Sequence, residues 1–123
     1  MSDKNLGSLQ VYKVSLEISH KAWNIYSSLP NEFRFNIGSQ FIRSVDSIGA
    51  NIAEGYGRYH FKDKIKFYYN ARGSLWESKH WFLLLYHRKL IDQECFESSL
   101  DRLDSLGKLL NAFIASTGNP NDK

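Results

Sequence analysis

Apolar residues recur every three or four positions along most of the chain, and this spacing limits the fold more than any other feature of the sequence. A period near 3.6 residues places such positions on one face of an α-helix. Pro30 and Pro120 are the only two prolines, so no proline interrupts a helix between them. The periodicity predicts four helices, at about residues 9–29, 37–56, 61–89 and 93–115.

Residues that begin or end helices flank three of these four segments. Ser8, Asn36 and Asp92 stand in N-cap positions before the first, second and fourth helices. Gly55 and Gly57 are predicted to end the second helix. The third helix has no cap-forming residue directly before it, so its start is the least clearly marked of the four.

No segment shows the alternation of apolar and polar residues that marks a β-strand. The connections between the helices are short, which makes neighbouring helices antiparallel. The expected fold is therefore all-α, a single domain over residues 1–123 built as an antiparallel up-down-up-down four-helix bundle.

The chain holds more aromatic and aliphatic surface than one small bundle needs, with 8 Phe, 7 Tyr and 3 Trp in 123 residues. Exposed aromatic surface of this kind is typical of subunit contacts, so we expect a homo-oligomer. The side chains that fall outside the main stripes of the first and third helices are Tyr12, Leu16, Trp23, Trp81, Leu84 and Leu85.

Several protein classes are excluded by simple counts. The longest apolar run, Trp81–Leu85, has five residues and is too short to cross a membrane, and no apolar signal segment follows Met1. Cys95 is the one cysteine, which excludes an intrachain disulfide and a cysteine-based zinc site. We therefore expect a cytoplasmic protein without membrane contact.

The formal net charge of +3 averages two opposed segments. Residues 55–91 carry a net charge of +6, and residues 92–123 carry −3. One interpretation is that the basic third helix pairs with the acidic fourth. The other is a basic surface for phosphate groups, and its candidate nucleic-acid-binding residues are Arg58, Lys62, Lys66 and Arg88.

Two Glu-x-x-His pairs, Glu17 with His20 and Glu77 with His80, match the ligand spacing of di-iron bundles. The helical phase places Glu17, His20 and Glu77 on outer sides of their helices, away from a shared core. No phosphate-binding glycine loop and no nucleophile motif is present. We therefore expect no metal, no cofactor, no catalytic residues and no enzymatic activity.

Arg72 and Lys79 fall within the predicted apolar arc of the third helix. A charge there needs a partner or a path to the rim, so a structural or interface role is favoured over a ligand-binding role.

The segment Ser39–Arg58 contains the run Ala-Asn-Ile-Ala-Glu-Gly at Ala50–Gly55 and resembles the 23S ribosomal RNA intervening-sequence protein family, also called the four-helix bundle protein family. Ala71–Leu75, followed by Glu77, resembles the second motif of that family, and Leu9–Tyr12 resembles its usual opening. The likeness spans about residues 8–115. Tyr59–Phe61 departs from the family pattern, where polar residues that cap a helix are usual.

The resemblance implies a bacterial cytoplasmic protein that assembles as a homopentamer of four-helix bundles. It also implies relatedness to basic pentameric accessory proteins of diversity-generating retroelements, which bind nucleic acid and a reverse transcriptase. No catalytic residues come with the family. Of the motif residues, Gly55 is read as a helix end, Asn51 and Glu54 as polar contacts at a helix or subunit junction, and Arg72 and Gly73 as structural positions.

Two functions remain as alternatives. One is a non-enzymatic, oligomeric protein that associates with RNA or another nucleic acid through its basic face. The other is a protein-binding scaffold or accessory subunit with no direct role in nucleic-acid binding.

Overall fold

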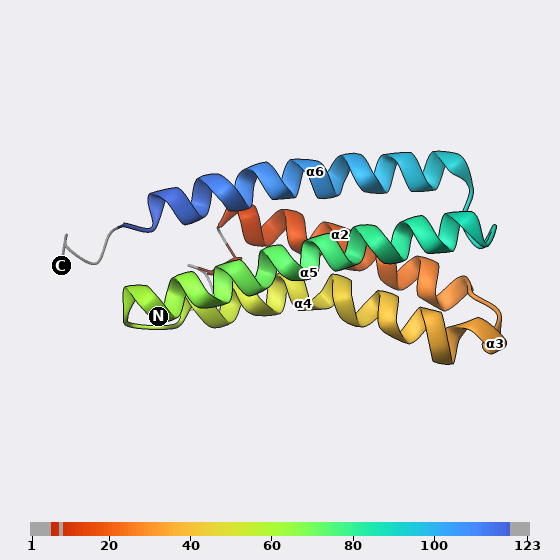
Figure 1. Cartoon of the computed structure of the whole chain (residues 1–123), viewed down its shortest axis with the longest axis horizontal. Helices are drawn as coiled ribbons and strands as arrows, with labels where there is room; N and C mark the ends of the chain where they lie inside the picture. Colours follow the sequence, from red (N-terminus) through yellow and green to blue (C-terminus); the bar gives the residue numbers. More distant parts are fainter. Residues whose placement is uncertain (1–5, 8, 119–123) are drawn as a thin grey trace.

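The computed structural model describes residues 6, 7 and 9–118, and within them the chain is all-α. Four long helices form the body of the molecule (Figure 1): α2 (Gln10–Ser28), α4 (Ser39–Tyr56), α5 (Phe61–His87) and α6 (Gln93–Ser116). The short helix α3 (Asn31–Phe33) and the π-helical turn η1 (Arg34–Gly38) connect α2 to α4. The ends of the long helices lie within two residues of the predicted ranges.

Successive long helices run in opposite directions along the bundle (Figure 1). Around the bundle the order is α2, α4, α5 and α6, and α6 closes against α2. This arrangement places the start of α2, the α4–α5 connection and the end of α6 at one end of the bundle. The turn η1 and the α5–α6 connection lie at the other end (Figure 1).

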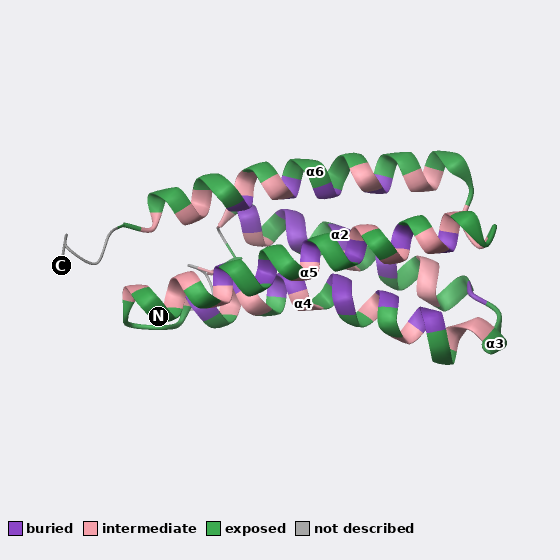
Figure 2. Ribbon diagram, in the orientation of Figure 1, coloured by how far each residue is buried: buried purple, intermediate pink, exposed green. Residues whose placement is uncertain are grey.

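The core runs along the inward sides of all four long helices (Figure 2). Its aromatic centre is the pair of Phe41 from α4 and Phe82 from α5, whose ring centroids lie 4.9 Å apart in an edge-to-face arrangement. Burial of a side chain of this size contributes about 1.5–3 kcal/mol to the free energy of folding. Other large side chains that are fully buried along the bundle include Tyr68, Ile48, Ile52, Leu75, Leu85, Leu103, Leu106 and Leu110.

Glycine allows α4 to approach both of its neighbours closely. A Cβ atom added at Gly49 would lie 2.8 Å from the Ser15 hydroxyl oxygen of α2, and one added at Gly55 would lie 2.6 Å from Cε1 of Tyr68 in α5. The prediction that Gly55 ends the helix is therefore wrong. Gly55 is buried inside α4, which continues to Tyr56, and its role is to admit the Tyr68 ring.

The Tyr68 side chain fills the space that Gly55 leaves, and only 1% of the residue is exposed. Its ring also packs against Phe113 of α6, with 4.8 Å between the centroids. Burial, together with the nearby Tyr56, raises the pKa of Tyr68 to about 12, because the phenolate form would lose its hydration.

Three predicted helix ends are confirmed, and one of them is Gly57, which is the C-cap of α4. Helix α2 ends before Pro30, and the Asp92 carboxylate accepts a hydrogen bond of 2.8 Å from the Cys95 backbone N–H, which confirms its N-cap role. The predicted cap at Asn36 is wrong, because the chain is already helical there and its side-chain amide donates to the Glu32 carbonyl. The predicted cap at Ser8 lies outside the described residues.

Helical spacing predicts an apolar stripe on α5 that includes Tyr68, Leu75, Trp76 and Phe82, and the structure confirms only part of it. Trp76, placed in the apolar stripe, is 63% exposed, and Leu85, placed outside it, is buried. Apolar residues cover most of the circumference of α5, so their spacing alone does not identify the side that faces inward. The residues on the true inward face are Tyr68, Ala71, Leu75, Ser78, Phe82 and Leu85.

Charged and polar side chains interrupt each long helix. As a result, none of the described helices combines the length and the apolar character that a membrane crossing requires.

Candidate nucleic-acid interface

A short exposed connection joins α4 to α5 at the end of the bundle where α2 begins (Figure 1). The last turn of α4 closes with the Gly57 N–H donating to the Ala53 carbonyl and the Arg58 N–H donating to the Gly55 carbonyl. The chain then becomes extended at His60 before α5 starts. The basic and aromatic side chains exposed in this region are Arg58, Tyr59, His60, Lys62 and Lys66, and we call them the basic turn; the carboxylate of Asp63 is exposed beside them.

Arg58 is held in place by its neighbours. Its guanidinium donates to the Glu54 carboxylate at 2.8 Å and lies 4.9 Å from the centroid of the Phe67 ring. An exposed ion pair of this kind contributes little to stability, but it fixes the direction of the Arg58 side chain. The same carboxylate offsets part of its positive charge.

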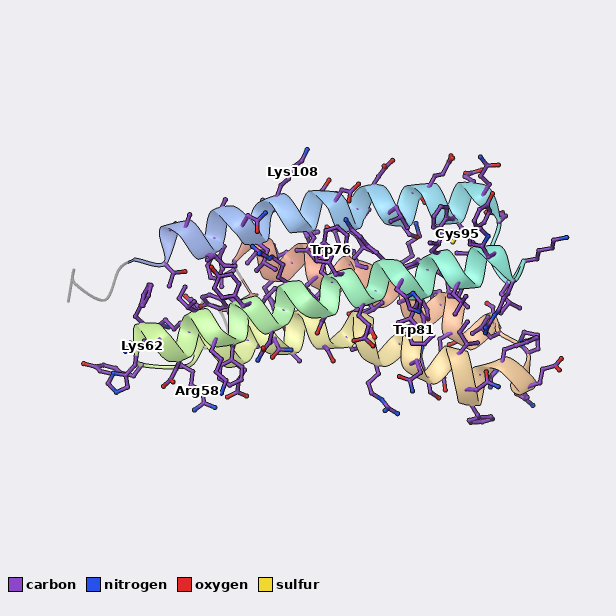
Figure 3. The ribbon with its side chains drawn as sticks, viewed as in Figure 1. Arg58, Lys62, Trp76, Trp81, Cys95 and Lys108 are labelled. Atoms are coloured by element: carbon purple, nitrogen blue, oxygen red, sulfur yellow. The ribbon has the colours of Figure 1, made fainter. Side chains whose placement is uncertain are left out.

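Lys62 and Lys66 stand one helical turn apart on the exposed side of α5, so their ammonium groups project from the same surface. Neither forms a salt bridge within the described part of the chain. Figure 3 shows Arg58 and Lys62 at the same end of the bundle. Clustered ammonium and guanidinium groups attract phosphate groups, and such binding weakens as the salt concentration rises.

Tyr59 is a member of this surface that the nucleic-acid prediction did not include. It is 85% exposed, the highest value among the large hydrophobic residues, and its ring stands edge-on to His60 at 5.0 Å. Exposed aromatic rings among cations are typical of surfaces that bind unpaired bases. The sequence did contain a signal for Tyr59, because Tyr59–Phe61 replaces the polar residues that are usual at this place in the family that the chain resembles.

Arg88 does not lie near the other three predicted contact residues. It is the C-terminal cap of α5, 26 positions after Lys62, which corresponds to about 39 Å along a helix. The structure therefore brings together Arg58, Lys62 and Lys66 and places Arg88 at the opposite end of the bundle.

The remaining motif residues have local roles. The Asn51 side-chain amide donates to the Ser47 carbonyl of the same helix at 2.9 Å, and Glu54 bonds Arg58 of the adjoining turn. These bonds stay within one helix and its end, whereas the sequence predicted contacts at a helix or subunit junction. Gly73 is exposed on α5, with nothing within 4 Å of an added Cβ.

A second surface lies between α5 and α6, where a groove of about 480 Å³ opens beside Trp76. Polar pairs cross it: the Arg72 guanidinium donates to the Asn111 amide oxygen at 3.0 Å, and the Lys79 ammonium donates to the Asp104 carboxylate at 2.6 Å. Arg72 and Lys79 therefore lie at the rim of the bundle, because other residues form the buried side of α5. We call this surface the α5–α6 groove.

The pattern considered for a metal centre does not assemble. Glu17 is exposed and forms a salt bridge with Arg102 of α6, and His20 is exposed on the same helix. Within the described residues, no three His, Cys, Asp or Glu side chains come together as a metal site.

Comparison with known proteins identifies a matching family model and similar solved structures. The model of the 23S rRNA-intervening sequence protein family matches residues 7–112. The crystal structure of a protein of unknown function from the S23 ribosomal protein family of Bacteroides thetaiotaomicron superposes with a TM-score of 0.80. It is 33% identical in sequence, and the match covers 86% of this chain and 96% of that one. Among curated proteins, none matches the sequence.

Proposed function

Because the chain belongs to the 23S rRNA-intervening sequence protein family, we propose that it is a non-enzymatic, oligomeric RNA-associated protein whose contact surface is the basic turn. The observation that supports this most strongly is the presence of Arg58, Lys62 and Lys66, together with the exposed ring of Tyr59, at one end of the bundle. Cations supply attraction to phosphate groups, and an exposed ring supplies a surface for bases.

Self-association is part of the proposal, with a homopentamer as the expected state. Its basis is the apolar surface that one bundle leaves uncovered, including Leu16 and Trp23 of α2, which are 41% and 56% exposed. Exposed patches of this kind mark protein contacts. Several copies would also multiply the basic turn on one particle. Light scattering is expected to give a mass near five times 14.3 kDa, and a value near 14.3 kDa would overturn the pentamer.

The location of RNA contact is tested by reversing two charges. Lys62→Glu combined with Lys66→Glu is expected to lower the affinity for structured RNA by about tenfold or more and to reduce the salt slope by about two, because each lysine releases one counterion. Filter binding over a series of salt concentrations measures both quantities. Both lysines are exposed, so the fold is expected to survive.

The matched control carries the same change in net charge at the other end of the bundle. Arg88→Glu combined with Lys89→Glu is expected to retain most of the affinity, because these residues lie far from the basic turn. Equal losses in the two double variants would contradict the assignment to the basic turn.

The alternative is a protein-binding scaffold, favoured by the same exposed apolar residues. It predicts that one protein partner co-purifies and resists nuclease treatment, and that the Lys62→Glu, Lys66→Glu variant retains that partner. For the RNA-associated protein, we propose a location in the cytoplasm of a bacterium.

A further inference from the structure

We propose that the α5–α6 groove binds an unpaired RNA base, which stacks on Trp76 while Lys108 and Arg72 hold the flanking phosphates. This inference rests on the proposed RNA association and adds a second contact surface with a different chemistry. The basic turn attracts phosphates of any strand. The groove distinguishes single-stranded from double-stranded RNA.

The aromatic platform is Trp76, which stands at the mouth of the groove and is 63% exposed. The Lys79 ammonium lies 4.2 Å from the centroid of the Trp76 ring, which fixes one side of the ring by a cation–π contact. Figure 3 shows Trp76 between α5 and α6. A base that stacks on this ring would cover apolar surface that the fold leaves in water.

The charges around the groove suit a phosphate. Arg72, Lys79 and Lys108 line it, against a single carboxylate, that of Asp104. Asp104 is paired with Lys79, whereas Lys108 forms no salt bridge among the described residues. Figure 3 shows the Lys108 side chain extending away from the bundle on α6, where it is placed to meet an approaching anion.

A second cation–aromatic pair stands next to the first. The Arg72 guanidinium lies 5.2 Å from the centroid of the Tyr69 ring, and Tyr69 is exposed. Tyr69 and Trp76 are seven residues apart on α5, which corresponds to about 10 Å along the helix. Alternating rings and cations form the pattern of surfaces that bind single strands.

The groove also continues the basic turn along one helix. From Lys66 to Trp76 the rise along α5 is about 15 Å, so a strand held at the basic turn reaches the groove within a few nucleotides. A duplex cannot use the ring in this way, because its bases are stacked on one another and its readable surface is the backbone and the shallow groove.

The direct test compares two RNA probes on the full-length protein. Trp76→Ala is expected to lower the affinity for a short labelled oligouridine by about tenfold, since stacking on one aromatic ring contributes about 1–3 kcal/mol per base. The affinity for a blunt RNA duplex is expected to stay within about twofold, because phosphate contacts dominate there. Fluorescence anisotropy measures both affinities.

Phe35→Ala is the matched control, because Phe35 is 74% exposed but lies in η1, at the end of the bundle away from the basic turn. It is expected to leave both affinities unchanged. Loss of oligouridine binding in both variants would overturn the assignment to the groove.

Asp104→Asn is expected to raise the affinity for oligouridine, a result that misfolding cannot produce. Removing the one carboxylate of the groove frees the Lys79 charge, and the oligouridine affinity is expected to rise about threefold, as for an exposed charge pair. An unchanged or lower affinity would contradict the proposal.

The outcomes separate the two proposals. A wild-type protein that binds neither RNA overturns both. A wild-type protein that binds the duplex with strong salt dependence, but binds oligouridine no better than the Trp76→Ala variant does, overturns the groove alone. A drop in particle mass for Trp76→Ala in light scattering assigns the ring to contact with a second copy and likewise overturns the groove proposal.

Discussion

Helix α5 makes contacts of opposite kinds on its two sides. Toward α4 the contact is closed: Gly55 admits the ring of Tyr68, and no room remains for even one added carbon atom. Toward α6 it is partly open: the Arg72–Asn111 and Lys79–Asp104 pairs cross it, and a groove of about 480 Å³ remains.

The two sides of α5 therefore differ in role: residues on the α4 side determine how closely the helices pack, and exposed residues on the α6 side are accessible for binding. The family motif that includes Gly55 lies on the closed side, where it determines how near two helices approach. On the open side, buried apolar contacts such as that of Tyr68 with Phe113 hold α5 to α6. The polar pairs that cross the groove at the surface contribute little to stability. Changes there alter the surface while the core stays intact.

The largest expected effect is on the closed side. Gly55→Ala is expected to lower the free energy of unfolding by up to about 3 kcal/mol, because the new Cβ would lie 2.6 Å from Cε1 of the buried Tyr68. Urea denaturation followed by circular dichroism measures the change. A variant as stable as the wild type would show that the ring shifts freely, and the contrast between the two sides would then fail.

The next effect depends on pH and uses the same contact. The pKa of Tyr68 is raised to about 12 in the folded state, from the ordinary tyrosine value of 10.0, so folding favours the protonated phenol. The contribution of Tyr68 to the free energy of unfolding is complete below about pH 10. This contribution, on the order of 2 kcal/mol, is lost as the pH rises through about 12. Urea midpoints across this interval are expected to fall less in Tyr68→Phe than in the wild type. Equal falls in the two proteins would argue against a buried phenol.

The smallest effect has the opposite sign and serves as the control for Gly55. Gly73 lies on the exposed side of α5, where nothing is within 4 Å of an added Cβ. Gly73→Ala is therefore expected to raise the free energy of unfolding by about 0.5–1 kcal/mol through helix propensity. The same denaturation experiment applies, and destabilisation by Gly73→Ala would mean that another surface covers this face.

The fold was largely predictable because helix length and helix breaks are local properties. Pro30 and the Asp92 cap mark two helix ends correctly. In α4 the helical spacing of Phe41, Val45, Ile48 and Ile52 predicts one inward stripe, because most residues between them are polar or small, and all four side chains are buried.

The binding surfaces were less predictable, because they depend on the rotation of α5 about its axis. Tyr69, Trp76 and Leu83 are as apolar as the true core residues, and only packing against α4 and α6 shows that they face outward. For the same reason, the apolar pattern placed Arg72 and Lys79 within the apolar arc of this helix, although both lie at the rim of the bundle. The separation of Arg88 from Lys62 follows from helix length alone, so the sequence already contained the signal for that error.

Helix α2 begins, and helix α6 ends, at the same end of the bundle as the basic turn (Figure 1). This geometry matters for anyone who immobilises or labels the molecule. A purification tag or a dye joined near residue 10 or residue 116 lies at the same end of the bundle as Lys62 and Tyr59. The connection between α5 and α6, at residues 88–92, lies at the far end, and it is the place for a reporter that leaves that surface open.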